Sequence, residues 1–293
     1  MPVTEHELAL GENIVKIRDA GSPSGIPVVY FHGTPGSRLD LTFGDDIAID
    51  VGVRLVSFDR PGFGGSSASS FGLTSVARDA IAIADHLDIE EFATLGLSGG
   101  GPFALATAVV GHDRVTKVGV ASGAGPFQLV PGAIAELSEI DTQAVNLLPD
   151  DPDAAAATFA SGFGSAALLD QDDDAFRAAF APILSARDRL IFADPIVGTA
   201  LIASIREGLR QGALGAGWDN VAWIGHWEID VPSIVTPVLL WYGTEDLMAQ
   251  PAHAYWLAEH LPNAHLVMRE GEGHLGLFDH FAEVLQALIA APT

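Results

Sequence analysis

Short apolar runs alternate with helical patterns along much of this chain, and that alternation narrows the folds it can adopt. The runs comprise residues 28–32, 54–58, 94–97, 117–121, 238–242 and 265–268. Runs that are apolar on both faces, with helices between them, are typical of parallel strands covered on both sides. The expected helices include residues 75–87 with Thr74 as N-cap, 103–110, 252–260 and 278–290. The sequence therefore predicts an α/β fold with a mostly parallel sheet.

Two regions depart from this rhythm. Residues 7–10 and 14–18 flank a Gly-Glu-Asn turn and predict an antiparallel hairpin ahead of the parallel strands. Between residues 126 and 232 the strand pattern is absent, although a connection between parallel strands needs only about a dozen residues. This stretch is rich in Ala and in acidic runs, which favours helix. We therefore expect an inserted helical subdomain at 126–232, and a core made of residues 1–125 and 233–293.

Charge and composition exclude several classes of partner and site. The 293 residues carry a formal net charge of −24, which would repel nucleic acid and anionic membranes. The chain has no Cys, so disulfides, thiolate nucleophiles and Cys-ligated metals are ruled out. We find neither an 18-residue apolar stretch nor a basic leader, and the expected location is the cytoplasm. No feature predicts an oligomeric state.

The motif G-x-S-x-G occurs at residues 96–100 (GLSGG), directly after an apolar strand and before a helical run. The string is weak by itself, but a strand–turn–helix context is the one in which a nucleophilic Ser is presented. Glycines on both sides allow strand and helix to approach around a strained Ser98. The helix N-terminus would then favour a developing oxyanion near that hydroxyl.

A serine hydroxyl needs a base, and the base needs an orienting carboxylate. Asp246 and His274 each follow a predicted strand and come after Ser98 in the order Ser, Asp, His. All three lie where parallel strands end, which is where open α/β sheets place their sites. The loop 32–36 (HGTPG) also follows a strand, and it can bring a backbone N–H to the same edge.

The chain resembles the α/β-hydrolase family over nearly its full length. The motifs that carry the resemblance are HGTPG at 32–36, DRPGFGGS at 59–66, GLSGG at 96–100, GTED at 243–246 and GEGH at 271–274. The resemblance implies an eight-stranded sheet flanked by helices, with 126–232 as a helical cap. It also implies Ser98 as nucleophile, His274 as base and Asp246 as its orienter. The N–H groups of Thr34 and Gly99 would form the oxyanion hole, and no cofactor or metal is expected.

Two other kinds of site, for a dinucleotide and for a metal ion, are not supported by the motifs. Residues 99–104 fit G-x-G-x-x-A, but they follow a late strand and lack the acidic partner of a dinucleotide site. No HExxH or ligand-spaced cluster suggests a metal site. Glu245 competes with Asp246, and the resemblance favours Asp246.

Several histidines and tryptophans are predicted to have structural or solvated positions rather than catalytic ones. Three histidines, at positions 253, 260 and 280, lie in expected surface helices and are predicted to be solvated. His32, Asp59 and Arg60 are predicted to be structural. The tryptophans at 218, 223 and 227 could line a pocket or pack within the insertion, and no residue there is predicted to contact substrate.

The nucleophile narrows the expected reaction. Enzymes of this family that open epoxides or remove halides use Asp at the elbow, so Ser98 favours acyl chemistry. We expect a serine hydrolase acting on small, largely apolar carboxylic esters, with a small molecule as its partner. The loop HGTPG is close to the HGGPG of proline iminopeptidases, so an aminopeptidase is an alternative, as is hydrolysis of a carbon–carbon bond. A receptor on the same fold that binds without turnover is the alternative from another class.

Overall fold

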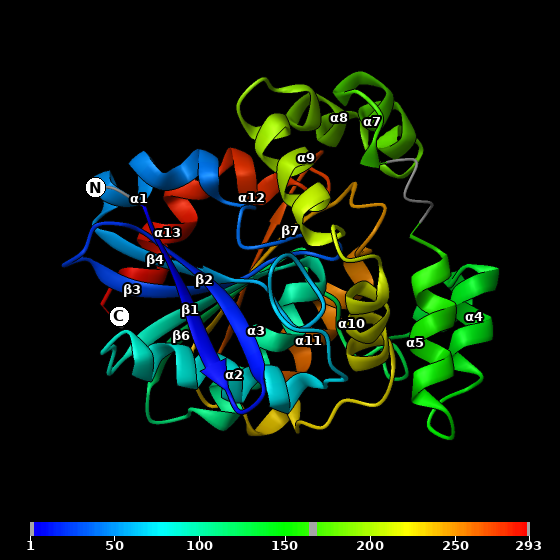
Figure 1. Cartoon of the computed structure of the whole chain (residues 1–293), viewed down its shortest axis with the longest axis horizontal. Helices are drawn as coiled ribbons and strands as arrows, with labels where there is room; N and C mark the ends of the chain where they lie inside the picture. Colours follow the sequence, from blue (N-terminus) through cyan, green and yellow to red (C-terminus); the bar gives the residue numbers. More distant parts are fainter. Residues whose placement is uncertain (1–2, 164–168, 292–293) are drawn as a thin grey trace.

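An eight-stranded sheet forms the centre of the molecule, here a computed structural model that describes residues 3–163 and 169–291 (Figure 1). The strands are β1 (Thr4–Leu10), β2 (Asn13–Gly21), β3 (Ile26–Phe31), β4 (Val53–Phe58), β5 (Phe92–Leu97), β6 (Val115–Ala121), β7 (Val238–Gly243) and β8 (Ala264–Arg269). Their order in the sheet is β1-β2-β4-β3-β5-β6-β7-β8. Strands β1 and β2 form the expected antiparallel hairpin, β2 is also antiparallel to β4, and all other neighbours are parallel. The predicted α/β class and mostly parallel sheet are confirmed.

Helices cover both faces of the sheet because successive side chains of a strand point to opposite sides. Val28 and Tyr30 of β3 lie in the core that includes α1 (Asp45–Val51) and α13 (Phe281–Ile289). Their neighbours Val29 and Phe31 lie in the other core, under α2 (Leu73–His86), α3 (Gly101–Val110) and α11 (Pro251–His260). Two apolar layers therefore sandwich the sheet.

Two helix predictions were wrong in detail. Helix α2 begins at Leu73 rather than Ser75, with Gly72 as N-cap, and Gly72 N–H donates to Ser75 Oγ at 2.9 Å. The predicted cap, Thr74, lies in the first turn, and its N–H and hydroxyl both donate to Glu228. Leu73 is buried in the core, and this packing starts the helix before Thr74, the residue that the local sequence indicates as its cap. The single helix expected at 278–290 is divided at His280 into α12 (Gly276–Asp279) and α13.

Helices fill the long stretch between β6 and β7 in the part of the chain that the structure describes. They are α4 (Glu139–Val145), α5 (Pro152–Ser161), α7 (Asp173–Phe180), α8 (Ala186–Ala193), α9 (Val197–Gly208) and α10 (Leu214–Ile224). Figure 1 shows α4 and α5 at one side of the molecule, apart from α7, α8 and α9. We call the stretch between β6 and β7 the insertion. Its helix α10 contacts α5 and the turn after β5, so the insertion reaches the carboxyl edge of the sheet near its middle. None of the described helices is both long and apolar enough to cross a bilayer.

The turn between β5 and α3 depends on glycines with no room for a side chain. Ser98 has φ +52°, in the left-handed region that non-glycine residues rarely adopt. A Cβ on Gly96 would lie 2.4 Å from the carbonyl oxygen of Gly100, and one on Gly100 would lie 2.2 Å from that of Phe31. The absent side chains let α3 start directly against β3 and β5, and they leave Ser98 half-buried at the sharp turn.

Gly100→Ala is expected to lower the free energy of unfolding by about 1–3 kcal/mol, because the new methyl group would collide with backbone atoms that cannot move aside. Urea denaturation measures this effect. Gly162→Ala is the matched control, since the nearest atom to its Cβ would be 3.3 Å away and its φ is −78°. A control as destabilised as Gly100→Ala would contradict the steric explanation.

Candidate active site

His274 and Asp246 form a buried pair at the carboxyl edge of the sheet. Asp246 follows β7 and His274 follows β8, and Nδ1 of the imidazole lies 2.9 Å from Asp246 Oδ2 and 3.0 Å from Oδ1. The N–H groups of Met248 and Ala249 donate to Asp246 Oδ1, both at 2.8 Å. Four contacts therefore fix the carboxylate, while the neighbouring Glu245 is exposed to solvent.

The two side chains shift each other's pKa values: the pKa of Asp246 is lowered and that of His274 is raised, so both ionised forms are favoured. Burial alone would raise the pKa of Asp246, but the His274 charge and the hydrogen bonds to the carboxylate lower it below the usual value. Burial alone would lower the pKa of His274, but the charge and hydrogen bond of Asp246, together with the charge of Asp188, raise it above 6.5. A proton on this imidazole is therefore stabilised by its surroundings.

Ser98 opens into the same cavity as His274. Among the described residues, no hydrogen bond to the Ser98 hydroxyl is formed, so Ser98 and His274 are brought together without a direct bond between them. Catalytic hydrogen bonds are often long before substrate binds. The cavity has a volume of about 80 Å³, and its wall is mainly apolar. The insertion contributes Phe180, Leu184, Phe192, Leu201 and Ile205.

Thr34 and Gly99 lie against each other beside this cavity. A Cβ on Gly99 would be 2.4 Å from Thr34 Oγ1, so the close approach of the two loops requires glycine at position 99. Within the described chain, the N–H of Thr34 has no hydrogen-bond acceptor, whereas that of Gly33 donates to Asp40 Oδ2 at 3.1 Å. Thr34 can therefore offer its N–H to an oxygen bound at the elbow.

A buried ion pair holds the loop that carries Thr34. Arg60 Nε donates to Asp219 Oδ1 at 2.8 Å, and both side chains are fully buried. Arg60 Nη1 also donates to the carbonyl of His32 at 2.7 Å, and the Thr34 hydroxyl donates to Asp219. The guanidinium lies over the ring of Phe103, with 4.8 Å to the centroid. Since Asp219 belongs to α10, the insertion is joined to this loop through charge and hydrogen bonds.

Asp40 and Asp188 are two further buried carboxylates that sequence reasoning missed. Asp40 lines the cavity and accepts from Tyr30 Oη, Gly33 N–H and Ser204 Oγ. Asp188 of α8 accepts from the N–H groups of the loop that carries His274. No local motif marks either residue, or Asp219, because their partners lie far away in the sequence.

The three histidines predicted to be solvated have different surroundings in the structure. His253 was predicted to be solvated, which is wrong: it is 3% exposed, and its Nδ1 accepts from Gly125 N–H at 3.0 Å. Burial lowers its pKa to about 4, so this histidine is neutral. His260 stacks on Trp256, and His280 contacts Glu272. His260 therefore packs on its own helix α11, whereas His280 lies between α12 and α13 and reaches back to the loop before α12.

His32, Asp59 and the tryptophans have structural contacts. His32 contacts the Gly33 carbonyl through Nδ1 at 2.8 Å, and Asp59 accepts from Arg38 and Gly65. Trp218 and Trp227 are buried in the core, and neither they nor Trp223 line the cavity at Ser98. Trp223 Nε1 nevertheless lies 3.1 Å from where a Cβ on Gly99 would be.

Asp219→Ala is expected to lower the free energy of unfolding by about 3–5 kcal/mol, because it leaves the Arg60 charge buried and unpaired. The control is Asp85→Ala, which removes the partner of Arg114 in a solvent-exposed pair and should cost less than about 1 kcal/mol. Urea denaturation of both variants tests the difference. Equal losses would show that burial does not distinguish the two pairs.

This chain is similar to several known proteins. The chain is 25% identical over 276 residues to a poly(3-hydroxyalkanoate) depolymerase of Ectopseudomonas oleovorans, covering 92% of this chain and 84% of that protein. It is 29% identical over 290 residues to a non-heme chloroperoxidase of Streptomyces lividans, covering 94% of each. The crystal structure of a hydrolase from Pseudomonas aeruginosa superposes with a TM-score of 0.71 at 18% identity, over 98% of this chain and 99% of that one, which shows a shared fold. The family model for the alpha/beta hydrolase fold matches residues 26–281, and the chain belongs to that family.

Proposed function

We propose that this hydrolase cleaves small, largely apolar carboxylic esters through an acyl-enzyme on Ser98. The observation that carries the proposal is one cavity that holds the Ser98 hydroxyl and the His274 imidazole, with Asp246 bound behind the imidazole. A base between a hydroxyl and a buried carboxylate is the arrangement that activates serine.

The proposed reaction has two halves. Ser98 Oγ attacks the acyl carbon while His274 Nε2 takes its proton, and the N–H groups of Thr34 and Gly99 hold the oxyanion. The C–O bond to the alcohol breaks, and the alcohol leaves with the proton from His274. Water then attacks the acyl carbon and gives a proton to His274, the bond between Ser98 Oγ and the acyl carbon breaks to release the acid, and His274 returns the proton to Ser98 Oγ. Asp246 fixes the imidazole and stabilises its positive form throughout.

The cavity wall supports a short, apolar acyl group. Its volume of about 80 Å³ is small beside the roughly 300–1,000 Å³ of pockets for drug-sized ligands. We infer that residues 126–232 act as a cap, since apolar side chains from this stretch line the cavity at Ser98. The name of the depolymerase relative refers to a polyester, which also supports ester chemistry.

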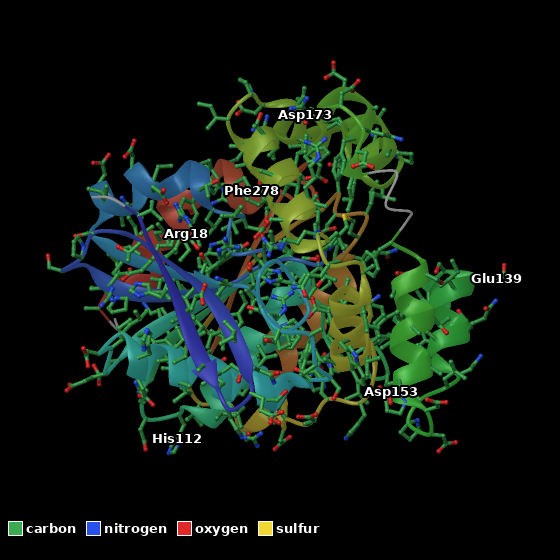
Figure 2. All side chains as sticks on the ribbon, viewed as in Figure 1. Arg18, His112, Glu139, Asp153, Asp173 and Phe278 are labelled. Carbon is green, nitrogen blue, oxygen red and sulfur yellow. The ribbon has the colours of Figure 1, made fainter. Side chains whose placement is uncertain are left out.

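The aminopeptidase alternative receives less support. It would use the acidic insertion to hold a substrate ammonium, yet Glu139 and Asp153 are exposed to solvent on α4 and α5, and Asp173 of α7 is paired with Arg206 (Figure 2). The insertion contributes apolar residues to the cavity itself. A cationic substrate would therefore lose hydration without gaining a partner from the insertion.

Ser98→Ala and His274→Ala are each expected to lower kcat by about a thousandfold or more, and the double variant should be little worse. The assay uses p-nitrophenyl esters from acetyl to octanoyl, with aminoacyl amides as a second panel. Intact-mass analysis after fluorophosphonate treatment should show one label that Ser98→Ala loses.

Ser122→Ala is the matched control, because Ser122 also has positive φ after a parallel strand and no role in this scheme. It should keep both label and activity. A label without turnover would favour the receptor alternative, and a fully active Ser98→Ala would refute the acyl-enzyme.

The pH dependence follows from the raised pKa of His274. Only the neutral imidazole can take the proton from Ser98, and a raised pKa extends the protonated form to higher pH. We therefore expect kcat/KM to rise with pH, with a midpoint above 6.5, the usual value for histidine, and to fall about tenfold per unit below it. Initial rates between pH 5 and 9 measure this profile, and a flat profile would exclude His274 as the base.

A further inference from the structure

Asp188 of α8 accepts hydrogen bonds from two consecutive backbone N–H groups, those of the candidate base His274 and of the next residue. Its Oδ2 accepts from His274 N–H at 3.0 Å, and its Oδ1 accepts from Leu275 N–H at 2.7 Å. The side chain is almost completely buried, with the residue 1% exposed. One carboxylate from the insertion thus fixes two consecutive N–H groups of the loop after β8.

The carboxylate is itself held in place within α8. Asp188 Oδ2 accepts from Ser185 N–H at 3.2 Å, and Ser185 Oγ accepts from Asp188 N–H at 3.1 Å. This reciprocal cap locks the side chain at the start of the helix. Asp188 cannot leave the His274 loop without breaking that cap.

No cation neutralises this buried charge within the described residues. Asp188 has no ion pair there: its neighbour Arg187 pairs with Asp279, and Arg189 donates to backbone carbonyls. Only N–H dipoles face the carboxylate. The charge of Asp188 raises the pKa of His274, whose backbone N–H the same carboxylate accepts from.

We propose that Asp188 is a positioning residue for His274, which holds the backbone of the base and stabilises its imidazolium form from the insertion side. His274 then lies between two carboxylates, Asp246 from the loop after β7 and Asp188 from α8. The proposal rests on the proposed function for its catalytic meaning. It makes the insertion part of the proton-transfer machinery as well as a wall of the cavity.

The other titratable groups around His274 do not supply this effect. The buried Tyr242 and His253 are each influenced by the charge of Asp246. Glu272, two residues before the base, contacts His280 at 2.6 Å. Asp188 is thus the second carboxylate that acts directly on the imidazole, through charge as well as through the backbone.

Gly273 offers a second way to disturb the same contact. A Cβ at this position would lie 2.1 Å from Asp188 Oδ2 and 2.3 Å from Ser185 Oγ. Gly273→Ala would therefore push the carboxylate away from the His274 loop while leaving the charge in the protein.

The test measures the pKa of His274 directly, by NMR of protein labelled with ¹³C at histidine Cε1. The signal is assigned by its loss in His274→Gln. Asp188→Asn keeps the size of the side chain and removes its charge, so the pKa of His274 should fall by about half a unit to one unit. The midpoint of kcat/KM should move to lower pH by the same amount, and kcat at pH 8 should fall about tenfold because the base is misplaced.

Asp194→Asn is the matched control. Asp194 lies in the same insertion and accepts from two backbone N–H groups, those of Ile196 and Val197, at 2.8 and 2.9 Å. It should leave the pKa of His274, the pH midpoint and kcat unchanged. If Asp188→Asn behaves like this control, or lowers only thermal stability, the proposal is overturned.

Two further measurements, on Gly273→Ala and on the wild-type chain, separate misfolding and failure of the proposed function from failure of this proposal. If Asp188→Asn does not fold, Gly273→Ala must lower the pKa of His274 in the same direction, and an unchanged pKa in that variant overturns the proposal. If the wild-type chain shows no turnover or fluorophosphonate label, the proposed function fails. The NMR titration still decides whether Asp188 stabilises the imidazolium.

Discussion

The parallel course of β3, β5, β7 and β8 is the constraint on which the site depends. Their carboxyl ends open at one edge of the sheet, and each is followed by a loop that carries one candidate group: Thr34, Ser98, Asp246 and His274. Groups up to 240 residues apart in sequence meet only because these strands run in the same direction. The glycines at the elbow add the local condition, since they allow α3 to start against β3 and hold Ser98 with positive φ.

The insertion between β6 and β7 stabilises this edge with carboxylates. Asp219 of α10 binds Arg60 and the Thr34 hydroxyl, which fixes the loop beside Gly99. Asp188 of α8 binds the backbone at His274, and Ser204 of α9 donates to Asp40 in the cavity wall. A donor or base whose neighbours are already fixed needs little reorganisation when charge develops, which is the condition for electrostatic catalysis.

Charge is distributed very differently on the surface and inside. The net charge of −24 comes mostly from side chains on the outside, and the acidic runs of the insertion face solvent. Inside, Arg60 and Asp219 neutralise each other, and Asp40 and Asp188 are each held by several donors. Since an unpaired buried charge is costly, these contacts explain how several ionisable groups can lie beside an apolar cavity.

Local patterns determined much of this protein in advance. The strands, the hairpin, the elbow at Ser98 and the order of Ser98, Asp246 and His274 are visible in the sequence, because periodicity and glycine spacing act over a few residues. The tertiary structure decided the rest. It buried His253, started α2 at Leu73, and placed Asp188 and Asp219 beside loops 86 and 159 residues away. A carboxylate in an acidic helix looks like any solvated one until folding sets a backbone N–H or a guanidinium against it. These contacts, and with them the shape of the cavity, follow from packing between distant segments, which no local pattern encodes.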